Sequence, residues 1–396
     1  MKNEEKFLKN MSYQEYQNRT IPTQDIDIKK LPPDKPLAVT VAFLVIIGLM
    51  TIFSASAQKC IDMGYNPLKF FIQQLLGVIV GCIFMYLASN FNYKQYKKWA
   101  FWGALTVIGL LFCVKLFGPI VNGAQRWLFI GPINLQPSEI AKPVVIMLIA
   151  GAFYKTSTIF TKEKILLAYI PILVMVALIF KQPNLSMVLL LLLTSTTIYI
   201  AAGGYLQILL AGALGGLVLL LRGLHDYQSS RIMTWLHPES DPLGAGYNIV
   251  QSLVAIASGG MLGVGYGNSK QKLAWLPEAH TDFIFSVYAE EMGFVGCLLL
   301  ICLFWSFLQR GMIIASKCPD MYGKLLALGI TFSICFQGFF NMWVASSFAP
   351  ATGVPMPFIS YGGTSIVVSL FMVGILFNIS KENEKKIRMQ QNVRYM

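Results

Sequence analysis

The sequence predicts an all-α polytopic membrane protein with about ten transmembrane helices, and three observations support this fold class. Hydrophobic residues make up 55% of the 396 residues, while charged residues make up only 13%. The mean hydropathy of +0.59 excludes an ordinary soluble globular protein. Apolar runs of about 20 residues, the length that crosses a bilayer as a helix, recur along the chain. None of these runs alternates apolar and polar residues as the strands of a β-barrel do.

The apolar runs give the expected helices in order along the chain. They lie at 37–57, 68–89, 99–117, 137–154, 164–180, 184–202, 206–222, 281–309, 323–348 and 361–380. The fifth and sixth runs are short and are separated only by residues 181–184, so nine and eleven spans are the alternatives. We expect a cytoplasmic N-terminal tail at 1–36, a membrane domain at 37–380 and a cytoplasmic C-terminal tail at 381–396. A large extracytoplasmic loop at 223–280 separates the seventh and eighth helices.

The formal net charge of +12 is explained by membrane topology rather than by a nucleic-acid partner. In the ten-helix arrangement, 21 of the 31 Lys and Arg residues fall in the two tails and in the loops of one face. The positive-inside rule assigns that face, with both termini, to the cytoplasm. The first 36 residues have no apolar core and do not resemble a cleavable signal peptide. The seven cysteines lack CxxC spacing, which disfavours a disulfide framework or a zinc site.

The outer loop after the third run contains Arg126 and Trp127, which have two interpretations. A Trp at a membrane face is commonly an interfacial anchor. Alternatively, Trp127 stacks on a sugar or lipid head group while the guanidinium of Arg126 binds a phosphate.

The fourth run opens with Glu139 and Lys142, an i,i+3 pair on one helix face near the outer boundary. The pair could be a local ion pair that makes both charges tolerable, or it could line a polar cavity and contact a substrate. Both interpretations stay open from the residues alone.

The long segment from 223 to 279 has no continuous apolar span, and a loop of this length in a compact protein is usually functional. It contains Arg231, and all three histidines (His225, His237 and His280) lie in it or beside it. Residues 246–262 read as an amphipathic helix that lies in the interface or re-enters the membrane. The glycines at 259–267 lack the GxxxxGK pattern of a nucleotide loop. Their turns could still bring N–H groups to a diphosphate, aided by Lys270 and Lys272.

The last outer loop, at 350–365, is rich in small and hydroxylated residues such as Ser360. These residues allow tight helix packing and capping, or they hydrogen-bond a polar ligand at the membrane surface.

Three ionisable residues, Glu278, His280 and Asp282, lie within five residues where polar sequence becomes apolar. Carboxylates at such a boundary cost free energy and need a reason to be there. One reason is helix capping, because Thr281 and Asp282 are both good N-cap types. The other is catalysis, and the residues alone slightly favour the cap. A Ser-His-Asp hydrolase built from Ser360, His280 and Asp282 fits no established spacing.

Four motifs in this order resemble the FtsW/RodA/SpoVE proteins of bacterial elongation, division and sporulation. They are Asn122-Gly-Ala-Gln-Arg-Trp127, Gln136-Pro-Ser-Glu139, Leu276-Pro-Glu-Ala-His-Thr-Asp-Phe-Ile-Phe285 with Ala289-Glu-Glu291 and Gly293, and Pro357-Phe-Ile-Ser-Tyr-Gly-Gly363. The similarity covers roughly residues 37–380. The third motif looks like the FtsW version, whereas Thr352–Pro357 looks more like RodA or SpoVE. The turn at Asn184 and Ser186 departs from the Gln-Pro-Asp-Leu-Gly of relatives.

The resemblance implies a ten-span peptidoglycan glycosyltransferase that polymerises lipid II in the bacterial cytoplasmic membrane. Its implied partners are lipid II with the growing lipid-linked glycan, a class B penicillin-binding transpeptidase, and other membrane proteins of the divisome or elongasome. The essential aspartate of the family corresponds to Asp282, which reverses the preference for a cap. Trp127, Glu139 and Lys142 correspond to further functional positions.

The chemistry of glycan polymerisation requires a base, because a sugar hydroxyl is a weak nucleophile at neutral pH. Asp282 is the expected general base, worth roughly 10² to 10⁴ in rate. The diphosphate leaving group calls for cations. The candidates are Arg126, Lys142, Arg231, Lys270 and Lys272, and His280 and Ser360 complete the expected substrate-binding set. We expect no cofactor; a divalent cation is an option, although no dedicated carboxylate cluster indicates one.

Two other functions compete with catalysis. A transporter or flippase of the lipid-linked precursor predicts ionisable residues near the bilayer midplane and internal repeats. The charges here cluster at the outer boundary and no clear repeat is present, which favours interfacial chemistry. A noncatalytic scaffold for a single-span partner would leave the acids and bases gathered on one face unexplained.

Overall fold

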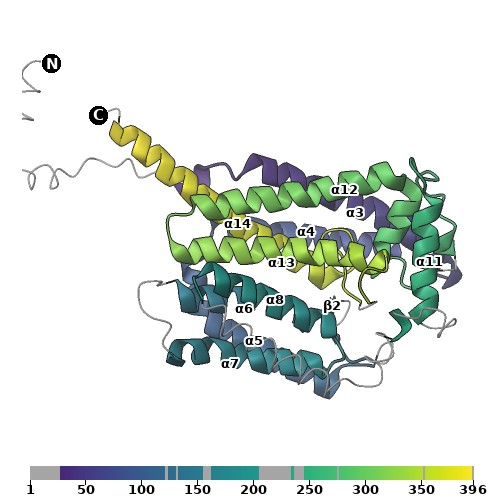
Figure 1. The fold of residues 1–396 in the computed structure, drawn as a ribbon, viewed down its shortest axis with the longest axis horizontal. Helices are drawn as coiled ribbons and strands as arrows, with labels where there is room; N and C mark the ends of the chain where they lie inside the picture. Colours follow the sequence, from purple (N-terminus) through teal and green to yellow (C-terminus); the bar gives the residue numbers. More distant parts are fainter. Residues whose placement is uncertain are drawn as a thin grey trace, which may run out of the picture.

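The computed structural model describes residues 27–120, 124–130, 133–154, 162–204, 233–235, 245–273, 276–350 and 353–394. The predicted seventh helix at 206–222 lies outside these residues, as do Arg231, His225 and His237. Long helices lie side by side in a bundle, and α11 (Ala245–Ser258) crosses one end of it (Figure 1). We call this end the outer end, and the opposite end, where α14 reaches the C-terminus, the inner end. Helix α11 confirms the predicted amphipathic helix, with a shorter C-terminal part.

The bundle helices follow the predicted apolar runs. They are α3 (Lys35–Asp62), α4 (Lys69–Asn90), α5 (Tyr96–Phe117), α6 (Pro137–Phe153), α7 (Lys162–Phe180), α8 (Leu185–Ala201), α12 (Ile284–Lys317), α13 (Met321–Ala345) and α14 (Gly363–Arg394). In the described part, six helices are long and apolar enough to cross a membrane: α3, α4, α5, α12, α13 and α14. Shorter apolar helices lie at Ala168–Phe180 and Leu185–Ala201. The prediction of an α-helical integral membrane protein is therefore confirmed.

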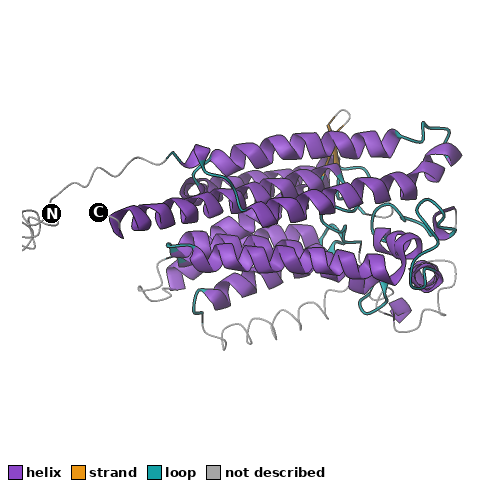
Figure 2. Ribbon diagram, turned by 90° about the horizontal axis from the view of Figure 1, so that it is seen from above, coloured by secondary structure: helices purple, strands orange, loops and turns teal. Residues whose placement is uncertain are grey.

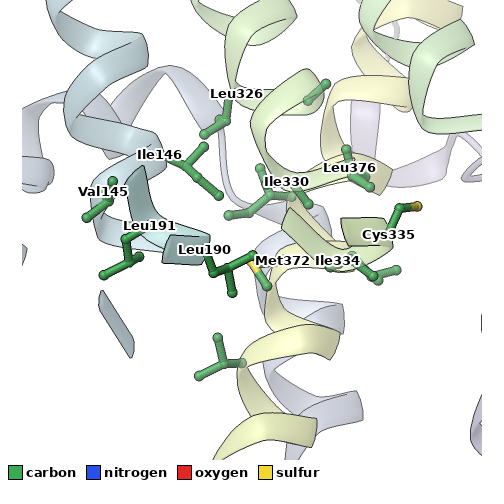
Figure 3. Packing of buried hydrophobic residues seen from close by; sticks show 14 of the residues in the cluster. Val145, Ile146, Leu190, Leu191, Leu326, Ile330, Ile334, Cys335, Met372 and Leu376 are labelled. Carbon is green, nitrogen blue, oxygen red and sulfur yellow. The ribbon is translucent and has the colours of Figure 1, made fainter. Parts of the chain in front are cut away.

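Helices α13 and α14 form the centre of the bundle, and α4 lies at its edge. Of the most apolar 18 residues of each, 72% and 78% are buried in α13 and α14, against 17% in α4. Figure 3 shows the packing of α6, α8, α13 and α14 through Val145, Ile146, Leu190, Leu191, Leu326, Ile330, Ile334, Cys335, Met372 and Leu376. Gly329 of α13 faces Ile146 and Ile198 so closely that a side chain would collide with both. A small residue here allows the close approach that helices need in a membrane.

Helix α12 is broken at Gly293, where φ is 64° and ψ is −166°. The break frees backbone groups, and the loop at 260–265 satisfies them. Freed carbonyl oxygens of residues 290 and 291 accept from the amides of 264 and 265 at 3.0 and 3.1 Å. The amides of 294 and 295 donate to the carbonyl oxygens of 260 and 261 at 2.9 and 3.2 Å. Irregular backbone at membrane depth persists only with such partners.

A short antiparallel hairpin, which the sequence did not predict, joins α5 to α6. Strand β1 (Leu128–Ile130) pairs with β2 (Ile133–Leu135), with Leu128 opposite Leu135. The hairpin stands out in orange among the purple helices of Figure 2. It lies at the outer end, where the chain passes from Trp127 to Gln136 at the start of α6.

The inner end is closed by bonds that α12 and α14 make to the segments at the inner ends of α3 and α4. Asp34, the N-cap of α3, forms a salt bridge with Arg310 of α12, and its amide donates to Ser380 Oγ at 3.1 Å. Asn378 of α14 accepts from Tyr93 N at 3.0 Å and donates to Ser89 O at 2.9 Å. Beyond these contacts α14 continues as a helix to Arg394 and projects from the bundle (Figure 1), although the predicted run ended at residue 380.

Candidate functional site

The catalytic candidate Asp282 lies in a turn of residues 276–283, directly before α12. The N-cap residue of α12 is Phe283, whose side chain makes no capping hydrogen bond. The alternative that Asp282 or Thr281 caps this helix is therefore wrong. The hydroxyl of Thr281 instead bonds within the turn, donating to Glu278 O at 3.1 Å and to Glu278 Oε2 at 2.8 Å.

Three consecutive carbonyl oxygens tie this turn to α13 and to the loop that joins α13 to α14. The bonds are Tyr361 N to His280 O at 3.0 Å, Ser360 Oγ to Thr281 O at 2.6 Å and Asn341 Nδ2 to Asp282 O at 2.8 Å. Each donor comes from a segment far along the chain. The backbone that carries Asp282 is consequently fixed by tertiary contacts rather than by helix α12 alone.

The side chain of Asp282 shares a small volume with that of Arg126. Both lie against Gly353, whose φ is +70°. A Cβ at Gly353 would lie 3.1 Å from Asp282 Oδ2 and 3.7 Å from Arg126 Nη1. A side chain at this position would therefore crowd the Asp282 carboxylate and contact the Arg126 guanidinium. The structure thus brings the predicted base and one predicted phosphate-binding cation into one place, and we call this group the Asp282 site.

Arg126 is oriented by the turn between α7 and α8. Its Nε donates to Gln182 O at 3.2 Å, and its Nη2 donates to Pro183 O. The carboxamide of Gln182 in turn donates to Leu111 O of α5 at 3.3 Å. This turn precedes Asn184, which serves as the N-cap of α8.

Trp127 follows Arg126 directly and is half-buried at the start of β1. Thr364 of α14 holds the far side of this hairpin, because its hydroxyl accepts from Gln136 N at 3.1 Å and donates to Asn134 O at 2.8 Å. The hairpin is thereby fixed beside the α13–α14 loop. The stacking role of Trp127 stays a prediction.

The predicted pair of Glu139 and Lys142 forms a buried ion pair. Lys142 Nζ lies 2.6 Å from Glu139 Oε2, and the side chains are 1% and 0% exposed. The ammonium also donates to Gln337 Oε1 at 2.8 Å, and Gln337 Nε2 donates to Pro355 O at 2.8 Å. The pair therefore connects α6 to the α13–α14 loop. Its contact with substrate stays a prediction.

His280 is buried in an aromatic environment beside the site. Its ring lies 5.1 Å from that of Phe70 and 5.8 Å from that of Tyr361. Burial and, to a smaller extent, the charge of Lys59 lower the pKa of His280, Glu278 opposes both, and the resulting pKa is about 4. Its Nδ1 has no hydrogen-bond partner among the described residues. His280 is accordingly neutral at pH 7 and presents no cation to a phosphate.

The remaining predicted residues occupy different environments. Lys272 forms a buried ion pair with Glu291 at 2.7 Å and donates to Ser54 Oγ at 2.7 Å, so its ammonium already serves contacts to α12 and α3. The side chain of Lys270 is exposed, while its amide donates to Glu290 Oε1 at 2.9 Å. Ser360 Oγ accepts from Met356 N at 2.7 Å and donates to the Asp282 turn, as described above.

Sequence reasoning missed Gln337, Asn341 and Gly353, three residues that shape the site. The two amides are spaced i,i+4 within the apolar run at 323–348, and buried polar groups in a membrane helix are a signal that could have found them. The role of Gly353 depends on a backbone angle that the sequence does not reveal.

The described residues contain no cluster of three or more His, Cys, Asp or Glu side chains that could hold a metal ion. In the Asp282 site, Arg126 is a protein cation that lies beside the carboxylate.

The chain matches a family model described as cell cycle protein, FTSW_RODA_SPOVE, over residues 35–385. Two curated relatives match over nearly their whole length. The probable peptidoglycan glycosyltransferase FtsW of Trichlorobacter lovleyi is 36% identical over 355 residues, 88% of this chain and 93% of the relative. The peptidoglycan glycosyltransferase MrdB of Escherichia coli is 36% identical over 361 residues, 88% of this chain and 94% of the relative.

A solved structure shares the fold. It comes from a study of how a peptidoglycan synthase complex coordinates polymerization and crosslinking, and it aligns with a TM-score of 0.75 at 27% identity. The alignment covers 89% of this chain and 99% of that chain. The overall fold of this chain is thus similar to that of a chain from a peptidoglycan synthase complex.

Proposed function

This chain belongs to the FtsW/RodA/SpoVE family of cell cycle proteins and is a peptidoglycan glycosyltransferase, and we propose that it polymerises lipid II with Asp282 as the general base. The observation that carries the proposal is the Asp282 site. A partly exposed carboxylate lies beside the guanidinium of Arg126, on backbone fixed by three tertiary hydrogen bonds.

In the proposed reaction, the 4-hydroxyl of the acceptor sugar attacks the anomeric carbon of the donor. The bond between that carbon and the lipid-linked diphosphate breaks, and the hydroxyl proton passes to the Asp282 carboxylate. Arg126 stabilises the negative charge that develops on the leaving diphosphate. A positioned base and a fixed cation need no reorganisation during the reaction, which is the main source of catalysis at such sites.

We place the protein in the bacterial cytoplasmic membrane with ten spans, both termini in the cytoplasm and the Asp282 site at the outer face. The ends of the described helices support this arrangement, because Asp34 bonds Ser380 and Tyr93 bonds Asn378 at the inner end, while Asp282 lies at the opposite end. The span at 206–222 completes the count of ten. Lys and Arg residues of the tails then lie inside, as the positive-inside rule requires.

We propose a class B penicillin-binding transpeptidase as the partner, within a larger divisome or elongasome assembly. The likeness to a synthase complex that couples polymerization to crosslinking supports a partner of this kind. Identity does not separate division from elongation, since the FtsW and MrdB relatives are both 36% identical to this chain.

Polymerisation with and without a chelator tests whether a divalent cation takes part.

The test is polymerisation of purified lipid II by the full chain with its transpeptidase partner, in detergent or liposomes. Wild type is compared with Asp282→Ala and Asp282→Asn, and with the control Asp62→Asn, which changes an exposed outer aspartate at the end of α3. Polymer from wild type and the control, with a loss of about 10² to 10⁴ for both Asp282 variants, supports the proposal. Equal polymer from all four removes Asp282 from the mechanism. No polymer from any of them makes lipid II translocation across vesicles the next measurement.

A further inference from the structure

Asn341 of α13 is a buried amide that bonds to irregular backbone on two sides. Its side chain is 1% exposed. Its Nδ2 donates to Asp282 O at 2.8 Å and to Val354 O at 2.7 Å. Both hydrogens of one amide nitrogen are therefore used outside the helix.

The two carbonyl groups that Asn341 binds belong to two walls of the Asp282 site. One is the carbonyl of Asp282 itself. The other belongs to Val354, which follows Gly353, the residue against which the Asp282 carboxylate lies. A single side chain thus sets the separation between the backbone of the base and the backbone behind its carboxylate.

Burial of the Asn341 amide lowers stability, which indicates that its hydrogen bonds serve a particular purpose. Oδ1 of Asn341 has no hydrogen-bond partner among the described residues. A buried acceptor without a partner destabilises a fold, whereas an apolar side chain at the same place carries no such cost. An amide at this position of an apolar helix is therefore explained by the two bonds that its nitrogen makes.

Gln337, one turn earlier on α13, is also a buried amide that bonds the α13–α14 loop, but its second partner is different. It donates to Pro355 O and accepts from Lys142, so it ties the α13–α14 loop to the buried ion pair. Among the described residues, the side chain of Gln337 has no hydrogen bond to the Asp282 turn, whereas the side chain of Asn341 bonds both the loop and the turn.

We propose that Asn341 is a positioning residue that holds the Asp282 carboxylate where it takes the proton of the acceptor hydroxyl. The inference rests on the proposed function. A misplacement of about 1 Å can cost about 10²-fold in rate, so Asn341→Ala is expected to lower kcat about 10- to 100-fold. KM is expected to change less than about threefold, because the amide acts on the base and not on substrate binding.

Asn378 of α14 offers a matched control at the inner end. It is also a buried amide that joins a helix to irregular backbone, through Tyr93 N and Ser89 O. Asn378→Ala removes two hydrogen bonds as Asn341→Ala does, and it does so far from the Asp282 site. Both variants are expected to lower the melting temperature by similar amounts.

The experiment measures kcat and KM for lipid II polymerisation and hydrogen exchange of the peptide at 276–285. The full chain with its partner is used as wild type, Asn341→Ala, Asn341→Ser, Asn378→Ala and Asp282→Asn. We expect kcat to fall from wild type to Asn341→Ser, whose hydroxyl keeps one donor, and further to Asn341→Ala. Exchange of the peptide is expected to rise for the Asn341 variants only. Asn378→Ala should keep kcat within about twofold of wild type.

The inference is overturned if folded Asn341 variants match Asn378→Ala in kcat, or if they lose activity through KM with unchanged exchange at 276–285. If Asn341→Ala does not fold, the same readouts on Asn341→Ser decide. Activity of Asp282→Asn equal to that of wild type removes Asp282 as the base of the proposed function, and this outcome is distinguishable from the results at Asn341.

Discussion

The two ends of the helix bundle use the same kind of residue in different ways. At the inner end, Asn378 engages both its acceptor and its donor. At the outer end, Asn341 engages only its donors and leaves Oδ1 without a partner among the described residues. The ion pairs differ too, since Asp34 and Arg310 are 12% and 26% exposed while Glu139 and Lys142 are 0% and 1% exposed. In these two comparisons the inner residues are better satisfied or more exposed, whereas the outer residues leave a buried acceptor without a partner and bury an ion pair completely.

The largest expected effect is a difference in the free energy of unfolding when each of the two ion pairs is broken. Glu139→Gln is expected to lower the free energy of unfolding by about 3 to 5 kcal/mol, because it leaves the buried Lys142 ammonium without its counter-charge. Asp34→Asn, which keeps an N-cap for α3, is expected to cost about 1 kcal/mol or less. Thermal unfolding in detergent measures both. Equal losses of unfolding free energy in the two variants would contradict the difference between the two ends. The double change Glu139→Gln with Lys142→Met should recover part of the loss caused by Glu139→Gln.

The next effect concerns His280 and acidity. Because burial lowers its folded pKa to about 4, the unfolded chain, with an ordinary pKa of about 6.5, binds the extra proton first as pH falls. The contribution of this residue is therefore complete above about pH 6.5 and is lost as pH falls to about 4, by about 3 kcal/mol in all.

Melting temperatures at pH 7.5 and pH 4.5 test this effect in wild type and in His280→Phe, which keeps an aromatic ring beside Phe70 and Tyr361. The variant is expected to lose less stability on acidification than wild type. The same loss in both proteins would show that His280 is not the group responsible.

A smaller effect is expected at two glycines that have nearly the same positive φ. Gly353 and Gly64 have φ of +70° and +71°, but a Cβ at Gly353 meets Asp282 and Arg126 while one at Gly64 meets nothing within 4 Å. Replacement by Ala is expected to cost about 1 to 2 kcal/mol of stability at each site, because L residues avoid this region. Only Gly353→Ala should also lower polymerisation, by about tenfold or more, through displacement of the carboxylate. Similar activity in the two variants would contradict the close contact.

The smallest effect lies on the part of α14 that projects from the inner end. Glu384 and Arg388 form an i,i+4 pair at 2.9 Å, with side chains 40% and 47% exposed. Arg388→Ala is expected to change the free energy of unfolding by no more than about 0.5 kcal/mol, since exposed helix pairs contribute little. A loss comparable to that of Glu139→Gln would show that this segment is not a solvated helix.

The sequence predicted the elements that are marked by a long apolar run, but not the features that depend on only one to three residues. Apolar runs of about 20 residues identified the helices, because bilayer thickness imposes that length. The hairpin at Leu128–Leu135 escaped because each strand has only three residues. The break of α12 at Gly293 escaped because one glycine in an apolar run is compatible with an unbroken helix.

At the site, the motif identified Asp282 but the residues alone favoured a helix cap, which the structure contradicts. Capping propensity is a local preference, and the tertiary bonds from Ser360, Tyr361 and Asn341 replace it here. The nearness of Arg126 to Asp282 was not predictable, since it arises from the packing of three separate outer loops. Lys272 was expected near a diphosphate, yet its charge faces Glu291, a pairing that depends on how the glycine-rich loop folds back onto α12.

The break in α12 has a practical consequence for labelling this protein. Residues 260–265 supply the hydrogen bonds that the broken helix lacks. An insertion in this loop would therefore shift its backbone out of register with α12. A tag or fluorophore inserted there would leave four backbone groups of α12 unpaired, and each such group costs several kcal/mol where water is excluded. The turn at Gly64, which has open space around it, is the better position for a probe on the outer surface.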